Sequence, residues 1–193
     1  QRGALRTMCS TLVRPGGDCP LQCLIANLKL PQVDVAAFRA VVTAGYGITP
    51  AVVTCNRAEF DAYLSGRCGL TADLRSALAA LGVAALVVTN GAAGATLYVA
   101  RTDDQPLIVD VPTPYVASRY GIGAGDAFVA ALAVEIGEAL APYDSVWSLA
   151  VLHVAELAEC VRRAAAVASE YIASGLSGVR RHSAASVQFC GLT

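Results

Sequence analysis

A glycine-rich loop followed by a single acid carries the clearest chemical signal in the sequence. It reads RYGIGAGDAF over residues 119–128, and an apolar run from Ala127 to Val134 follows it. A helix that begins at such a loop presents free backbone N–H groups and a positive dipole end, which attract phosphate. Asp126 could accept a proton from a hydroxyl that attacks a phosphoryl group, or it could simply cap the helix. The loop is not a Walker loop, because no Gly-Lys-Ser/Thr follows.

Two further polar clusters follow predicted strands. Asn56 and Glu59 lie three residues apart, so they could hold a hydrated Mg²⁺ ion or form a capping arrangement at a helix start. Thr89 and Asn90 could donate to phosphate oxygens or begin a turn. Ligands of open α/β sheets gather at the carboxyl ends of strands, and this is where we expect both clusters and the glycine-rich loop.

The elements that must position these residues alternate along the chain. Residues 1–20 look irregular. Predicted strands cover 21–28, 50–56, 83–89, 95–100 and 106–112, with a possible last strand at 186–190. Predicted helices cover 33–42, 57–66, 71–81 with Thr71 as its cap, 127–140 and 148–174. Strands that alternate with helices predict an α/β protein with a mostly parallel sheet.

Composition excludes several classes of protein. The chain has 193 residues, 55% hydrophobic and 15% charged, with a net charge of −1, so it is neither disordered nor suited to non-specific binding of nucleic acid. Residues 76–100 carry no charge, but Asn90, Gly91 and Gly94 interrupt them, so we expect strands and a turn rather than a membrane span. The seven scattered cysteines favour reduced thiols in an intracellular protein, for which we expect the cytoplasm. Arg2, Arg6 and Arg14, with no acid before Asp18, could be the trace of a transit peptide, so a mitochondrial protein is the alternative.

In this order and spacing, the three motifs resemble the carboxy-terminal half of the ribokinase (PfkB) superfamily of small-molecule kinases. There an Asn-x-x-Glu, a Thr-ended strand before a Gly-x-x-Gly turn and a Gly-Ala-Gly-Asp helix start recur. Within it, the pyridoxal kinase branch is the most similar. The stretch at 33–67, VDVAAFRAVVTAGYGITPAVVTCNRAEFDAYLSGR, resembles a helix, strand and helix end of that branch, and SRYGIGAGDAFVAALAV at 118–134 resembles its glycine-rich run. The resemblance covers about residues 31–190.

This resemblance implies a fold and a set of residue roles. The fold would be a ribokinase-like three-layer sandwich with a mostly parallel central sheet, with residues 1–30 unplaced and 31–193 forming its carboxy-terminal, ATP-binding part. Asp126 would be the catalytic base, and the N–H groups of Gly123, Ala124 and Gly125 would form an anion hole for the phosphoryl group.

The resemblance also implies a nucleotide and a metal. Asn56 and Glu59 would organise Mg²⁺ and the phosphates of ATP, with Glu59 as the metal ligand. Thr54, Thr89 and Asn90 would contact the phosphates.

The implied activity is that of an ATP-dependent kinase of a small hydroxylated substrate, most similar to an ATP:pyridoxal 5'-phosphotransferase. The alternative is a catalytically inactive kinase-derived subunit with a structural role in a larger assembly. Ala124 stands where pyridoxal kinases carry Thr, and Cys55 stands where they carry Pro. Because half of a ribokinase-like sheet would expose a hydrophobic edge, we expect a homodimer or a larger assembly.

Overall fold

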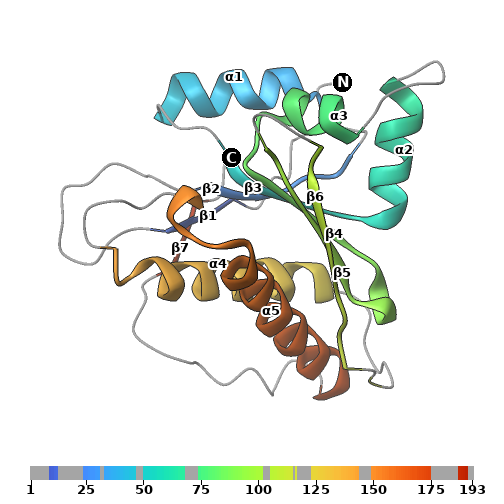
Figure 1. The fold of residues 1–193 in the computed structure, drawn as a ribbon, viewed down its shortest axis with the longest axis vertical. Helices are drawn as coiled ribbons and strands as arrows, with labels where there is room; N and C mark the ends of the chain where they lie inside the picture. Colours follow the sequence, from blue (N-terminus) through green and yellow to red (C-terminus); the bar gives the residue numbers. More distant parts are fainter. Residues whose placement is uncertain are drawn as a thin grey trace.

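A mixed seven-stranded sheet forms the centre of the protein (Figure 1). The computed structural model describes residues 9–12, 24–30, 33–46, 50–67, 74–101, 105–114, 116, 123–143, 149–174 and 187–190. The strands are β1 (Cys9–Leu12), β2 (Leu24–Asn27), β3 (Pro50–Asn56), β4 (Ala85–Thr89), β5 (Ala95–Val99), β6 (Leu107–Val111) and β7 (Val187–Cys190). They lie in the order β6-β5-β4-β3-β2-β1-β7.

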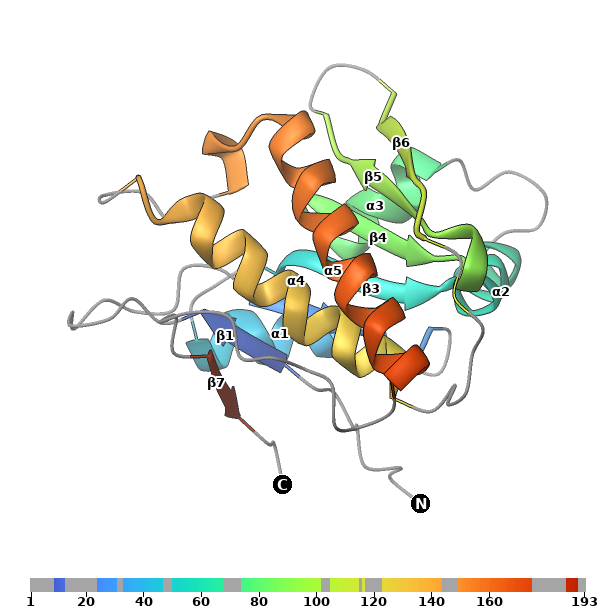
Figure 2. The ribbon, with the colours of Figure 1, turned by 90° about the horizontal axis from the view of Figure 1, so that it is seen from below.

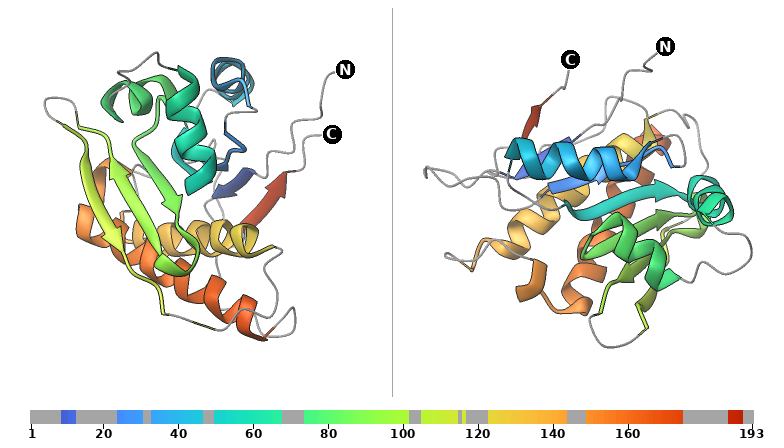
Figure 3. Two further views of the ribbon diagram at one scale, coloured as in Figure 1. Left: turned by 90° about the vertical axis from the view of Figure 1, so that its right-hand side faces the viewer. Right: turned by 90° about the horizontal axis from the view of Figure 1, so that it is seen from above.

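Helices cover both faces of this sheet. Five helices are described, namely α1 (Val35–Tyr46), α2 (Arg57–Arg67), α3 (Leu74–Leu81), α4 (Ala124–Leu140) and α5 (Val154–Ser174), together with short 3₁₀ turns at η1 (Gly91–Ala93) and η2 (Leu149–Val151). Helices α1, α2 and α3 lie on one face, and α4 and α5 lie side by side across the other (Figures 2 and 3). This arrangement confirms the α/β class and the three-layer sandwich expected from the sequence.

Each face of the sheet has its own hydrophobic core. Alternate side chains of a strand point to opposite faces, so Val87 packs against α4 and α5 while Leu86 packs with α2 and α3. On the α4 side, Leu132 and Ile136 are fully buried. Burial of one such side chain stabilises a fold by about 1.5–3 kcal/mol, which explains why α4 is apolar along most of its length.

Parallel pairing is confined to the three central strands. β2, β3 and β4 are parallel, whereas β5 is antiparallel to both of its neighbours, β4 and β6, and β1 is antiparallel to both β2 and β7. The connection between β4 and β5 is too short to cross back over the sheet, so only a hairpin is possible. Its last residue, Gly94, has φ of 96°, and an added Cβ there would lie 2.2 Å from the Val111 carbonyl oxygen. This turn therefore requires glycine.

Three sequence-based boundaries change in the structure. The prediction that residues 1–20 are irregular is wrong at 9–12, where β1 pairs with strands distant in sequence. Helix α4 begins at Ala124 rather than Ala127, because Gly123 starts it in a left-handed conformation. The predicted helix over 148–174 is divided into η2 and α5. The predicted cap Thr71 lies outside the described residues.

The uncharged stretch at 76–100 folds into most of α3, then β4, η1 and β5, as expected. Among the described helices, none combines the length and apolarity needed to cross a membrane. At one edge of the sheet, β6 exposes two large apolar side chains, Leu107 at 37% and Ile108 at 55%.

Candidate active site

The carboxyl ends of the three parallel strands lie in one row. The register places Asn27 of β2 beside Thr54 of β3, and Asn56 of β3 beside Thr89 of β4. The polar residues that the sequence places after separate strands therefore become neighbours at one edge of the sheet, where α/β proteins bind ligands.

Helix α4 begins next to this row with an open N-terminus. Gly123 caps it with φ of 86°, and its carbonyl accepts the first helical hydrogen bond from Ala127 at 2.9 Å. An added Cβ at Gly123 would lie 2.8 Å from the hydroxyl of Tyr171 on α5, whereas one at Gly125 would meet no described atom within 4 Å. Gly123 is needed for the shape of the turn, and Gly125 leaves the space beside the free N–H groups open.

Asp126 lies in the first turn of α4 and is exposed to solvent. The alternative that it caps the helix is wrong, because Gly123 occupies the cap position without any side-chain hydrogen bond. Within the described part of the chain, the Asp126 carboxylate has no hydrogen bond or ion pair. It is thus available to a ligand, and its charge interacts favourably with the positive end of the helix dipole.

A pocket of about 140 Å³ opens on the α4 and α5 side of the sheet. Its wall combines the β4–β5 turn, the start of α4, the chain after β6 and the last turns of α5. It is lined by Thr89, Gly91, Gly94, Ala95, Thr113, Ala124, Gly125, Phe128, Ala165, Ala168, Ser169 and Ile172. Most of these side chains are small and apolar, with three hydroxyl groups among them, which is typical of a site for a small organic ligand.

Asn56 and Glu59 form a reciprocal capping box at the start of α2. The Asn56 N–H donates to Glu59 Oε2 at 2.9 Å, and the Glu59 N–H donates to Asn56 Oδ1 at 2.8 Å. Lys29 Nζ approaches Glu59 Oε1 at 3.5 Å. The capping alternative from the sequence is therefore confirmed.

Metal binding at Glu59 stays a prediction. The described residues contain no group of three or more His, Cys, Asp or Glu side chains that could hold a metal ion. Magnesium is commonly bound through one or two carboxylates together with waters and substrate phosphates, and a single Glu59 is compatible with that mode.

The two threonines at the strand ends are already hydrogen-bonded. The Thr54 hydroxyl is buried and donates to Asn27 Oδ1 at 3.2 Å, and the Thr89 hydroxyl donates to the Cys55 carbonyl at 3.4 Å. Burial, with the charge of Glu59 adding to it, raises the pKa of the Cys55 thiol to about 12. Phosphate contacts by either threonine stay predictions.

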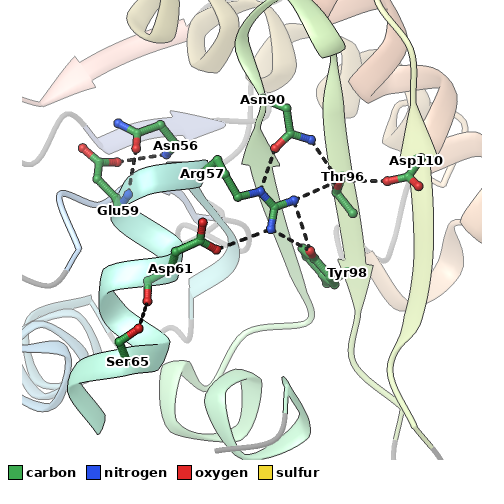
Figure 4. Close-up of polar contacts among 9 residues, drawn as sticks. All are labelled: Asn56, Arg57, Glu59, Asp61, Ser65, Asn90, Thr96, Tyr98 and Asp110. Carbon is green, nitrogen blue, oxygen red and sulfur yellow. Dashed lines mark hydrogen bonds and ion pairs between the residues drawn. The ribbon is translucent and has the colours of Figure 1, made fainter. Parts of the chain in front are cut away.

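Asn90 points to the opposite face of the sheet, toward Arg57 of α2 (Figure 4). Arg57 Nε donates to Asn90 Oδ1 at 3.0 Å, and the Asn90 amide donates to Thr96 Oγ1 at 3.0 Å. The guanidinium also reaches Thr96 at 3.3 Å and the Tyr98 hydroxyl at 3.4 Å. The hydrogen bond that the guanidinium donates to the Tyr98 hydroxyl is the main reason that the pKa of Arg57 is raised above its usual value. Both polar ends of Asn90 are thus occupied within this network, and its contact with phosphate stays a prediction.

The structure therefore divides the residues selected from the sequence. Thr89, Ala124 and Gly125 line one pocket, and Asp126 is the next residue along the first turn of α4. Sequence analysis missed four residues of this region, namely Asn27, Arg57, Thr113 and Ser169. Arg57 stands inside the Asn-x-x-Glu motif, and Ser169 follows a run of apolar residues in α5. Both positions therefore carried a signal, but the sequence does not say which side chains they contact.

Comparisons with known proteins agree with this fold. Residues 26–179, well over half of the chain, match the family model described as pfkB family carbohydrate kinase. The search of curated proteins found no match. Among solved structures, ribokinase from Giardia lamblia matches with a TM-score of 0.53 and 16% identity, covering 77% of this chain and 44% of that one.

Two fructokinases also match. The Xylella fastidiosa enzyme with bound ATP has a TM-score of 0.53 and 22% identity, with 74% of this chain and 41% of that chain covered. The Vibrio cholerae enzyme with fructose, ADP and calcium bound has a TM-score of 0.48 and 21% identity, with 72% and 40% covered. The chain thus spans about two fifths of the length of these structures.

The match over residues 26–179, on a three-layer α/β fold of the ribokinase type, identifies the chain as a member of the pfkB family of carbohydrate kinases.

Proposed function

We propose that the chain is the nucleotide-binding part of an ATP-dependent kinase that phosphorylates a hydroxyl of a small molecule. The arrangement at the start of α4 carries this proposal. The pocket reaches Ala124 and Gly125, whose position at the helix N-terminus suits phosphate, and the free carboxylate of Asp126 lies on the exposed side of the same turn. A nucleotide in the pocket would therefore direct its phosphates toward Asp126, the proposed catalytic base.

The chemistry follows from this placement. The N–H groups of Gly123, Ala124 and Gly125 would stabilise the negative charge on the oxygens of the transferred γ-phosphoryl group. Asp126 would accept the proton of the substrate hydroxyl. The substrate oxygen would form its bond to the γ-phosphorus while the bond to the bridging oxygen breaks, which releases ADP.

Magnesium would be held near the strand ends, with Glu59 binding it directly or through water. The reciprocal bonds with Asn56 hold the Glu59 side chain in one orientation, which suits a ligand that must be positioned. When bound, the ion would neutralise phosphate charge. Thr54, Thr89 and Asn90 would bind phosphate only by giving up the hydrogen bonds described above, and the loss of those bonds would offset part of what each contact contributes.

For the substrate, we propose pyridoxal or a related form of vitamin B6, on the basis of the motif resemblance. The family model describes carbohydrate kinases, so a sugar hydroxyl is the competing substrate. A panel of pyridoxal, fructose, ribose and a nucleoside separates these classes, and the substrate with the highest kcat/KM decides between them.

The experiment has two parts. Thermal shift of the chain with Mg-ATP tests nucleotide binding, because a ligand at 100 times its Kd stabilises the folded state by about 2.7 kcal/mol. Phosphoryl transfer is then followed as ADP production. We expect Asp126→Asn to lower kcat by about 10²–10⁴ while the Kd for ATP changes little, because Asp126 does not line the pocket.

Glu138→Gln is the matched control, since Glu138 is another exposed acid on α4, and we expect it to leave kcat within about twofold. An Asp126→Asn enzyme with unchanged kcat would contradict the base role. The absence of any shift with Mg-ATP would instead favour the inactive, structural subunit.

We also propose that the protein forms a homodimer or a larger assembly. The edge strand β6 exposes Leu107 and Ile108, and a sheet edge with apolar side chains tends to pair with another chain. Light scattering measures the molar mass directly. A monomer at all concentrations would contradict this proposal without affecting the kinase proposal.

A further inference from the structure

A pair of hydroxyl groups lines the pocket where the chain after β6 meets α5. Thr113 Oγ1 lies 3.0 Å from Ser169 Oγ, and Ser169 Oγ donates to the Ala165 carbonyl at 2.9 Å. Thr113 Oγ1 also lies 3.4 Å from the same carbonyl. Ser169 is 7% exposed, so its hydroxyl has little access to bulk water.

The protons of this pair can be counted. Each hydroxyl has one proton and two lone pairs. If Ser169 donates to the Ala165 carbonyl, Thr113 donates to Ser169. If Ser169 donates to Thr113, then Thr113 donates to the carbonyl. Both hydroxyls can also donate to the carbonyl, which has two lone pairs. In all three arrangements each proton is used inside the group of three residues, and only lone pairs are left for the pocket.

The third hydroxyl of the pocket behaves in the same way. Thr89 donates its proton to the Cys55 carbonyl. All three hydroxyl-bearing side chains that line the pocket, as far as the structure describes it, therefore present acceptors and no donor. A ligand group that needs a donor from these side chains would have to break one of these bonds, and a buried polar group left unpaired is unfavourable.

We propose that Thr113 and Ser169 are specificity-determining residues that recognise an exocyclic amino group on the base of the bound nucleotide. The inference rests on the proposed function, because it assumes that the pocket holds the base while the N–H groups at the start of α4 face the phosphates. The amino group donates one hydrogen to the lone pairs of the pair. A base without this donor leaves these acceptors desolvated and unsatisfied.

The decisive measurement compares two nucleotides that differ only in this group. ATP and purine riboside 5'-triphosphate share all ring nitrogens, but the second lacks the 6-amino group. We expect the chain to bind ATP about tenfold more tightly, which corresponds to about 1.4 kcal/mol and to one net hydrogen bond. Calorimetric titration of the chain in the presence of Mg²⁺ gives both Kd values.

Variants assign the preference to the pair. Thr113→Val keeps the shape of the side chain but removes the acceptor, so the ratio of the two Kd values should fall to about twofold or less. Ser169→Ala should also lower it, because this variant removes the acceptor lone pairs of Ser169 and leaves only those of Thr113. Thr113→Ser keeps the hydroxyl and should retain the ratio. Ile172→Val changes only apolar lining and should affect both nucleotides alike.

The outcomes separate this inference from the proposed function. Equal affinity for the two nucleotides, or a ratio unchanged by Thr113→Val, would overturn the inference and leave the kinase proposal standing. Binding of neither nucleotide would overturn both. A variant that weakens both nucleotides equally, with the ratio preserved, would show that the pair only supports the pocket wall, and would also overturn the inference.

Discussion

Replacement of Arg57 by methionine tests whether the polar network of Figure 4 holds α2 against the β4–β5 hairpin. Methionine keeps most of the aliphatic stem but removes every donor, together with the guanidinium group whose carbon lies 5.8 Å from the centre of the Phe60 ring. Asn90 Oδ1 then loses its partner at 3.0 Å, while Thr96 keeps its bonds to Asn90 and Asp110. The loss is therefore concentrated on Asn90.

The magnitude follows from the contacts. A hydrogen bond from a charged donor contributes about 1.5–3 kcal/mol, but the Arg57 side chain is 41% exposed, so the low end applies. The contacts with Thr96 and Tyr98, at 3.3–3.5 Å, are long and add little. The ion pair with Asp61 at 3.7 Å is exposed and adds less than about 1 kcal/mol. We expect a loss of about 2 kcal/mol and a fall in Tm of about 4–8 °C.

Urea denaturation of the chain measures this loss, and Arg101→Met is the control. Arg101 is an exposed arginine, so its replacement should change the free energy of unfolding by less than about 0.5 kcal/mol. In a double-mutant cycle with Asn90→Ala, we expect a coupling energy of about 1 kcal/mol. Additive effects, or a loss equal to that of Arg101→Met, would refute the structural role assigned to Arg57 and return Asn90 to the candidates for phosphate binding.

Two further predictions concern backbone shape and thiol chemistry. Gly94→Ala should destabilise the chain by more than about 2 kcal/mol, because the new Cβ would overlap the Val111 carbonyl. Gly91 also has a positive φ but lies in open space, so Gly91→Ala should cost only about 1 kcal/mol. Equal losses of the free energy of unfolding in the two variants would contradict the close approach at Gly94. Because the pKa of Cys55 is raised from 9.0 to about 12, native Cys55 should react with iodoacetamide at pH 8 about a thousandfold more slowly than after unfolding. Between pH 9 and 12 the folded state keeps the Cys55 thiol proton while the unfolded state loses it, so the free energy of unfolding should fall as the pH rises over this range. If the difference in the free energy of unfolding between the wild type and Cys55→Ala did not change with pH, the raised pKa would be contradicted.

Local patterns in the sequence predicted most of the elements. The strand at 50–56 agrees with β3 at both ends, and β4, β5 and β6 lie inside their predicted ranges. The Asn56–Glu59 spacing predicted the capping box that forms. The capping box depends on residues within a few positions of one another, and the strands carry local patterns of apolar and β-branched residues, so both could be predicted before the strand partners were known.

Strand β1 could not be predicted in this way. It pairs with β2 and with β7, which lies near the other end of the chain, and no periodicity within residues 9–12 indicates those partners. The start of α4 was predicted three residues too late for a related reason. A left-handed glycine at the cap leaves no pattern of its own, and its need for glycine comes from Tyr171 on another helix.

By itself, the sequence determined the α/β class, the glycine-rich helix start with its single carboxylate, and the order of the polar clusters after the strands. The tertiary structure alone decided which of these residues meet. Thr89 and Asn90 are adjacent in sequence, yet one lines the pocket and the other joins Arg57 on the opposite face. Thr89 is the last residue of β4, whereas Asn90 begins the β4–β5 turn, where hydrogen bonds with Arg57 and Thr96 hold its side chain. Thr113 and Ser169, 56 positions apart, share a proton network only because the chain after β6 packs against α5.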